Sequence, residues 1–386
     1  MTPTRQSPGE LLARLVGFDT VSAKTNLALI EYVRGYLRAQ GVDSVLIPNE
    51  EGTKANLHAT IGPRENGGIA LSGHTDVVPV EGQAWSSDPF VLSERDGRLH
   101  GRGSCDMKGF LACVLALVPE MVAARLKTPI HLLFSYDEEV GCTGVRRMID
   151  ALGSQLAAPR LVIVGEPTMM QVVDAHKSIQ EFVTEVTGYE AHSSMVHLGA
   201  NAIFAANEII GEIARVRDDL VARGDPSGRF TPPFSSIHVG EISGGTAINI
   251  VPRHCRVHWE MRGLPGAHPG EVLERVARFG RETVLPKLQA VSEETGVETR
   301  LGVLVPALEG GEEDAAQTLA LRLAGRNETF AVSYGTEAGL FRHAGIPTVI
   351  CGPGDIAQAH KPDEYVDKEQ LAACTQFLGR LIETAR

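Results

Sequence analysis

The stretch "GIALSGHTDVVPVEG", residues 68–82, joins an apolar segment to His74 and Asp76, two side chains that can bind metals. The apolar residues predict a short buried strand that ends at His74. Side chains at positions i and i+2 of an extended chain face the same way, so we expect Asp76 to accept a hydrogen bond from the His74 ring and orient it. Pro79 limits further strand pairing. A single His-x-Asp pair is more often structural than functional, so the wider pattern must decide.

Segments on both sides of this stretch alternate between strand-like and helix-like patterns. Such alternation predicts an α/β domain whose mainly parallel mixed sheet is flanked by helices. The expected strands are 44–48, 55–61, 68–74, 129–139, 160–166, 328–335 and 347–354, and the expected helices are 8–16, 26–41, 107–124, 141–152, 315–325, 336–345 and a last one from about residue 367.

The pattern changes near residue 178, where antiparallel-type strands and two amphipathic helices begin. Their order is β-α-β-β-α-β, which is typical of a ferredoxin-like α+β domain. We therefore expect one α/β domain formed by residues 1–177 and 306–386, interrupted by a smaller domain at residues 178–305. The expected elements of the insert are strands 178–188, 235–245, 247–262 and 296–305, and helices 200–224 and 269–291.

Composition narrows the possible partners of the protein. The 386 residues are 43% hydrophobic and 22% charged, with a net charge of −12 and no basic block. This charge argues against nucleic acid and anionic membranes as partners. The first ten residues lack the apolar core of a signal peptide, and six cysteines without a CxxC pattern indicate reduced thiols. We therefore expect a cytoplasmic protein with neither nucleic acid nor membranes as partners.

Several histidines and carboxylates follow the ends of predicted strands. In open α/β sheets functional groups gather beyond the carboxyl ends of the strands. Each of these residues alone could be a turn, a cap or a solvated loop, but five such positions in one alternating domain indicate a shared site. Nitrogen and oxygen ligands without cysteine suit Zn²⁺, Co²⁺ or Mn²⁺, and this set could hold a pair of ions if Asp106 bridges them. The candidate ligands are His74, Asp106, Glu139, Glu166 and His360.

The chain resembles the M20 metallopeptidase/deacylase family. The resemblance is carried by "SGHTDVVPV", "GRGSCDMKG", "DEEVGCTG", "VGEPT", "AHSSMVHLGANAI", "INIVPRHCRVHWEMRGLPG" and "AHKPDEYV", which occur in the family's order. It implies a zinc-peptidase-like catalytic domain with an inserted lid and dimerisation domain. It also implies two divalent ions, Zn²⁺ first, with Asp106 bridging, His74 and Glu166 at one ion, and Glu139 and His360 at the other.

The same resemblance implies roles around the metals. Glu138 would be the general base, Asp76 would orient His74, and His192 would donate to the oxyanion, either within one chain or from a partner subunit. The implied substrate contacts are Asn249, Arg262, Gly335 and Thr336, and Glu337 beside them is a further candidate, for a substrate ammonium group.

The implied reaction is hydrolysis of an N-acyl amino acid, with N2-acetyl-L-ornithine as the expected substrate. A succinyl-diaminopimelate desuccinylase, another N-acyl amino-acid deacylase or a dipeptidase remains open. The resemblance also implies a homodimer formed through the inserted domain.

Overall fold

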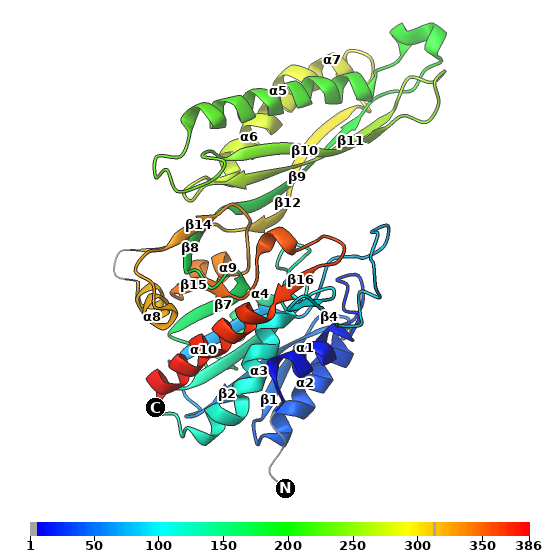
Figure 1. The fold of residues 1–386 in the computed structure, drawn as a ribbon. Coiled ribbons are helices and arrows are strands. Elements are labelled where there is room, and N and C mark those ends of the chain that lie inside the picture. The colour runs from blue at the N-terminus through cyan, green and yellow to red at the C-terminus, as the bar shows by residue number, and fades with distance from the viewer. Residues whose placement is uncertain (1–5, 312–313) are drawn as a thin grey trace. The chain divides into compact units, whose positions relative to one another are not determined.

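The computed structural model describes residues 6–311 and 314–386 (Figure 1). The chain forms two compact units. The first extends to Ala175 and also contains Leu308–Phe330 and Thr336–Arg386, and the second consists of His176–Ala307 and Ala331–Gly335. The expected boundaries at residues 177/178 and 305/306 lie close to these limits. The return of Ala331–Gly335 to the second unit has no counterpart in the sequence pattern.

A nine-stranded mixed sheet runs through the first unit in the order β1-β2-β6-β3-β7-β15-β8-β13, with β14 paired to β8. Strands β6, β3, β7 and β15 are parallel to one another, and the β1–β2, β2–β6 and β15–β8 pairs are antiparallel. The expected mixed sheet is confirmed, and its parallel strands lie at the centre. The strands are β1 (Ser44–Pro48), β2 (Ala55–Ile61), β3 (Ile69–His74), β6 (Ile130–Ser135), β7 (Leu161–Pro167), β8 (Val173–His176), β13 (Leu308–Glu309), β14 (Phe330–Val332) and β15 (Thr348–Gly352).

Helices cover this sheet, which explains why its central strands β3, β6, β7 and β15 are buried along their whole length. Helix α3 is buried on nearly all sides and packs against α1 and α10, as Figure 1 shows. Helix α1 begins with a capping box between Ser7 and Glu10. The helices are α1 (Pro8–Val16), α2 (Leu27–Ala39), α3 (Lys108–Ala123), α4 (Val145–Ala151), α8 (Ala315–Ala324), α9 (Ala338–His343) and α10 (Lys368–Ala385), with a short 3-10 turn η3 (Ile356–Gln358).

The two faces of β3 have different surroundings. Leu71 belongs to the apolar core that includes Leu111 of α3 and Leu378 of α10. Neighbouring side chains of a strand alternate between faces, so Ser72 and His74 face away from that core. The opposite face of β3 therefore carries polar groups up to the end of the strand.

A small three-stranded sheet connects two loops, and the sequence pattern does not predict that these loops pair. It consists of β4 (Ser93–Arg95), β5 (Arg98–His100) and β16 (Tyr365–Asp367). Strand β16 pairs antiparallel with β5, which places Tyr365 opposite His100. The stretch after His360 is thereby held beside the stretch that leads to Asp106. A strand of three residues is too short for its alternating hydrophobic pattern to be recognised in the sequence.

The second unit is a four-stranded antiparallel sheet with helices on one face. Its order, β10-β11-β9-β12, and its element sequence agree with the expected β-α-β-β-α-β arrangement. The core between sheet and helices includes Phe182 and Trp259, whose rings stack with centroids 4.2 Å apart. The elements are β9 (Ser178–Thr187), η1 (Ser193–Leu198), α5 (Ala202–Arg223), β10 (Ser236–Gly244), β11 (His254–Gly263), α6 (Pro269–Phe279), η2 (Gly280–Val284), α7 (Leu285–Gln289) and β12 (Gly296–Val305).

Two further observations concern the chain as a whole. Within residues 6–311 and 314–386, no helix is both long enough and apolar enough to span a membrane. All six cysteines are buried and carry free thiols.

Candidate active site

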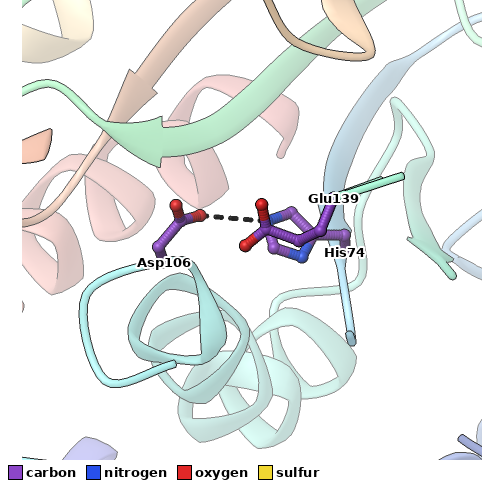
Figure 2. Close-up of side chains that lie close together, drawn as sticks. All are labelled: His74, Asp106 and Glu139. Carbon is purple, nitrogen blue, oxygen red and sulfur yellow. Dashed lines mark hydrogen bonds and ion pairs between the residues drawn. The ribbon is translucent and has the colours of Figure 1, made fainter. Parts of the chain in front are cut away.

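The five candidate ligands converge at one edge of the first unit's sheet. His74 is the last residue of β3, Glu139 follows β6, and Glu166 lies in β7. Asp106 stands just before α3, and His360 lies in the loop between β15 and β16. Because parallel strands end at the same edge of a sheet, residues that are far apart in sequence meet there. Figure 2 shows three of them, His74, Asp106 and Glu139, close together.

The distances divide the site into two halves that share Asp106. His74 Nε2 lies 3.0 Å from Asp106 Oδ1 and 3.7 Å from Glu166 Oε1. His360 Nε2 lies 3.0 Å from Glu139 Oε2 and 3.4 Å from Asp106 Oδ2. The two oxygens of Asp106 thus face the two histidines separately. This is the arrangement that a carboxylate bridging two cations requires.

The buried carboxylates of this cluster repel one another, so the cluster is electrostatically unfavourable in the absence of cations. Burial raises the pKa of Glu138 and of Glu166 well above the usual range, and burial together with Asp106 raises the pKa of Glu139 to about 7. Burial opposes the charge on Asp106 as well, but hydrogen bonds with His360 and His74 hold its pKa below the usual range. Crowded carboxylates must take up protons or a cation to reduce their repulsion.

The donor set fits a divalent metal. Glu166 Oε1 is buried and has no hydrogen-bond partner among the residues that the structure describes, which is an unusual state for a carboxylate oxygen. Ligand atoms lie within 4.8 Å of one another in each of two groups, His74 with Asp106 and Glu139, and His74 with Glu138 and Glu166. Imidazole nitrogen and carboxylate oxygen are ligands of Zn²⁺ and of related ions. A cation at this place would satisfy the unpartnered oxygen and offset the negative charge.

Asp76 occupies the expected place but acts differently from the expectation. Its backbone oxygen, not its carboxylate, lies at hydrogen-bond distance from His74 Nδ1, at 2.9 Å, whereas the carboxylate Oδ1 is 3.6 Å away. The carboxylate instead accepts from the backbone N–H groups of Glu138 and Glu139 and from Ser22 Oγ. Asp76 therefore orients the His74 ring through its main chain and fixes the Glu138–Glu139 loop through its side chain.

Glu364 is a site residue that the sequence interpretation missed. It forms a buried ion pair with Arg102, Oε2 to Nη1 at 2.8 Å, and both side chains are 1% exposed. It also accepts from the backbone N–H groups of Gly103, Cys105 and Asp106 at 2.8–3.0 Å. One carboxylate thus fixes the loop that presents Asp106. A signal was available, since a glycine-containing loop must find acceptors for its buried N–H groups.

Three residues of the inserted domain are expected to contact the substrate, and all three lie in the second unit. They are His192, Asn249 and Arg262. His192 and Asn249 are exposed and neighbouring: residue 192 bridges to Ile250, and Ser193 N donates to Asn249 O at 3.0 Å. Ser194 N donates to His192 Nδ1, so the neutral ring carries its proton on Nε2. Arg262, on β11, pairs with Glu260 at 3.0 Å.

Gly335 packs against the start of β9 in the same unit. A Cβ at this position would lie 2.6 Å from Ile179 Cγ1 and 3.1 Å from Lys177 O, so only glycine fits without a shift.

Thr336 and Glu337 are buried, and both make hydrogen bonds within the first unit. Thr336 Oγ1 accepts from Ala338 N at the start of α9. The carboxylate of Glu337 is fully buried, and both its oxygens accept from serine hydroxyls, those of Ser72 and Ser135. Each oxygen of Glu337 thus already accepts one hydrogen bond from within the protein. Sequence alone does not show this, because burial at a helix start depends on what packs above it.

Known proteins resemble this chain over nearly its whole length. A model of Peptidase family M20/M25/M40 matches residues 70–384. Acetylornithine deacetylase from Myxococcus xanthus is 36% identical over 387 residues, covering 99% of this chain and 98% of the relative. The same enzyme from Yersinia pseudotuberculosis is 34% identical, covering 97% and 96%.

Solved structures share the fold. A metallo-carboxypeptidase of the M20 family from Sulfolobus solfataricus superposes with a TM-score of 0.75 at 18% identity, covering 98% of this chain and 99% of that one. A dinuclear metal-binding peptidase of the same family, YXEP from Bacillus subtilis, has a TM-score of 0.66 at 18% identity, covering 97% and 96%.

The fold and the cluster of histidines and carboxylates define a metallohydrolase whose site takes divalent metal ions. The chain belongs to Peptidase family M20/M25/M40, as the family match and the relatives above 30% identity show.

Proposed function

We propose that the protein is a deacetylase that hydrolyses N2-acetyl-L-ornithine to L-ornithine and acetate, a step of arginine biosynthesis. The observation that carries this proposal is the convergence of five metal-binding side chains and Glu138 at one sheet edge. The choice of substrate is supported by relatives named acetylornithine deacetylase, which match the chain from end to end.

In the proposed mechanism, His74 and Glu166 would hold one divalent ion, Glu139 and His360 would hold a second, and Asp106 would contribute to both sites. Zn²⁺ is the proposed ion, with Co²⁺ or Mn²⁺ as substitutes. When bound, such ions polarise a carbonyl group and lower the pKa of a bound water molecule. Glu138 accepts the proton of the attacking water and passes it to the leaving amine. Its raised pKa suits a group that must both take up and release a proton.

The second unit supplies the groups proposed to hold the substrate. His192, with its proton on Nε2, can donate a hydrogen bond to an oxyanion. Arg262 suits a substrate carboxylate, because guanidinium and carboxylate can form two parallel hydrogen bonds. Asn249, beside His192, is a further proposed contact.

A substrate panel combined with metal removal tests this function. The protein is stripped with a chelator, reloaded with Zn²⁺, Co²⁺ or Mn²⁺, and assayed with N2-acetyl-L-ornithine, succinyl-diaminopimelate, other N-acyl amino acids and a dipeptide. We expect no turnover without metal, and a kcat/KM for acetylornithine at least about tenfold above the others, a difference of about 1.4 kcal/mol. A higher value for succinyl-diaminopimelate would replace the proposed substrate. A His192→Ala variant with full activity would remove His192 from the mechanism.

We further propose that the protein is a homodimer formed through the second unit. Strand β10 is an edge strand, and beside it lies a set of exposed apolar side chains that we call the β10 patch. Ile248 is 100% exposed and Phe204 is 72% exposed, although exposed clusters of large apolar side chains are rare on monomers. Contacts between the segments 192–193 and 249–250 bring the residues of η1 close to Ile250. Its members are Met195, Val196, Leu198, Phe204, Ile242, Ile248 and Ile250.

The dimer proposal predicts a change of mass on mutation of the β10 patch. Wild type should show twice the chain mass by light scattering after size-exclusion chromatography. The double variant Phe204→Asp/Ile248→Asp should show the mass of a single chain, because two charges in a desolvated interface are unfavourable. Val45→Asp, at an exposed valine of β1 in the first unit, is the control and should leave the mass unchanged. A monomeric wild type would contradict the proposal.

A further inference from the structure

Glu337 is a buried carboxylate at the start of helix α9. Its side chain is fully buried, and within the described residues no lysine or arginine lies at ion-pair distance from it. Oε1 accepts from Ser72 Oγ at 2.6 Å, and Oε2 accepts from Ser135 Oγ at 2.7 Å. Burying a carboxylate is costly unless compensating charge is near, and two hydroxyl groups supply only part of that compensation.

The two serines stand at the ends of the strands that present the metal site. Ser72 lies two residues before His74 on β3, so both side chains share a face. Ser135 is the register partner of His74 across the parallel β3–β6 pair, and it is the last residue of β6 before the Glu138–Glu139 loop. The Glu337 carboxylate therefore joins β3 and β6 directly below the point where both strands deliver site residues.

The electrostatic neighbours of Glu337 are the site residues themselves. Burial raises the pKa of Glu337, whereas the hydrogen bonds from Ser72 and Ser135 and the charge of His74 favour its ionised form. In turn Glu337 contributes to the raised pKa of Glu166. With the charge of the site's own carboxylates close by, an ionised Glu337 requires positive charge in the site, which divalent cations would provide.

We propose that Glu337 is a positioning residue for the metal centre: its negative charge stabilises the bound cations, and its bonds to Ser72 and Ser135 fix the strand ends that carry their ligands. It does not contact the substrate. This inference rests on the proposed metal-dependent function. Helix α9, which begins after Glu337, would then contribute to metal binding although it supplies no metal ligand.

The test compares charge removal with bond removal. Glu337→Gln keeps the size of the side chain and one acceptor, but removes the charge. Ser72→Ala/Ser135→Ala removes the bonds and keeps the charge. Glu328→Gln, at an exposed glutamate of the same unit, is the matched control. Zn²⁺ affinity is measured by equilibrium dialysis, the folding of the metal-free protein by thermal unfolding, and kcat and KM with acetylornithine after saturation with metal.

Glu337→Gln should weaken Zn²⁺ binding by about 10–100-fold, the usual effect of losing a partner behind the ligands, while KM at saturating metal stays unchanged. The double variant Ser72→Ala/Ser135→Ala should weaken Zn²⁺ binding to a smaller extent, and the control Glu328→Gln should leave Zn²⁺ binding unchanged. Unchanged Zn²⁺ affinity in Glu337→Gln would overturn the proposal, and a raised KM with unchanged affinity would restore a substrate contact. If Glu337→Gln fails to fold, an unchanged Zn²⁺ affinity of the double variant Ser72→Ala/Ser135→Ala would overturn the proposal instead. A wild type that binds no metal would refute the proposed function itself.

Discussion

Glu138→Ala should lower kcat for acetylornithine by at least about 10²-fold while the metal content stays at the wild-type level, since a positioned acid–base group contributes about that much or more. Glu138 lies beside the candidate ligand Glu139, and its backbone N–H donates to the Asp76 carboxylate. Burial raises the pKa of Glu138 above the usual range of a glutamate. Metal analysis and steady-state kinetics on the same preparation check the result.

The neighbouring acid provides the matched control. Asp137 is directed to Lys54, with which it forms an ion pair, and not to the candidate ligands. Asp137→Ala should therefore leave kcat close to wild type. Normal turnover of Glu138→Ala with full metal content would remove Glu138 from its role as base. Loss of metal from Glu138→Ala would instead make Glu138 a ligand, in the group it forms with His74 and Glu166.

Glu364→Ala should destabilise the protein by about 3–5 kcal/mol, because removing one partner leaves the buried Arg102 charge unpaired. The backbone N–H groups of Gly103, Cys105 and Asp106 would also lose their acceptor. Since Asp106 lies in this loop, metal content should fall together with stability. Urea unfolding and metal analysis measure both effects.

Two comparisons separate the contributions to this effect. Glu94→Ala breaks the exposed ion pair between Glu94 and Lys368 and should cost at most about 1 kcal/mol. The double variant Arg102→Met/Glu364→Ala removes the unpaired charge and should recover part of the stability. The metal loss should persist in the double variant, because the loop N–H groups still lack an acceptor. Full recovery of metal binding would show that Glu364 does not fix the Asp106 loop.

Most strands and helices of the first unit could be predicted from sequence because they have a strong local signal. Apolar runs such as 69–73 and 130–134 occur where both faces of a strand are covered, and they end where polar groups begin. The same signal placed His74, Glu139 and Glu166 at strand ends. Since parallel strands end at a common edge, their convergence followed from the topology alone.

The partners of individual polar groups could not be predicted in this way. Asp76 follows His74 by two residues, yet its carboxylate turns to the N–H groups of Glu138 and Glu139. Glu364 stands in an acidic stretch that looks solvated, yet it is buried against a loop some 260 positions away. A carboxylate accepts hydrogen bonds from whichever donors the fold brings near. The identity of these donors does not correspond to any periodic pattern in the sequence.

The sequence by itself determined the α/β class, the inserted antiparallel unit and the identities of the side chains that can bind metal, because hydrophobic period and residue chemistry are local properties. The tertiary structure decided that Asp106 faces both histidines, that Glu364 holds its loop and that Glu337 lies beneath the site. Those outcomes depend on distances between segments remote along the chain, and only packing fixes such distances.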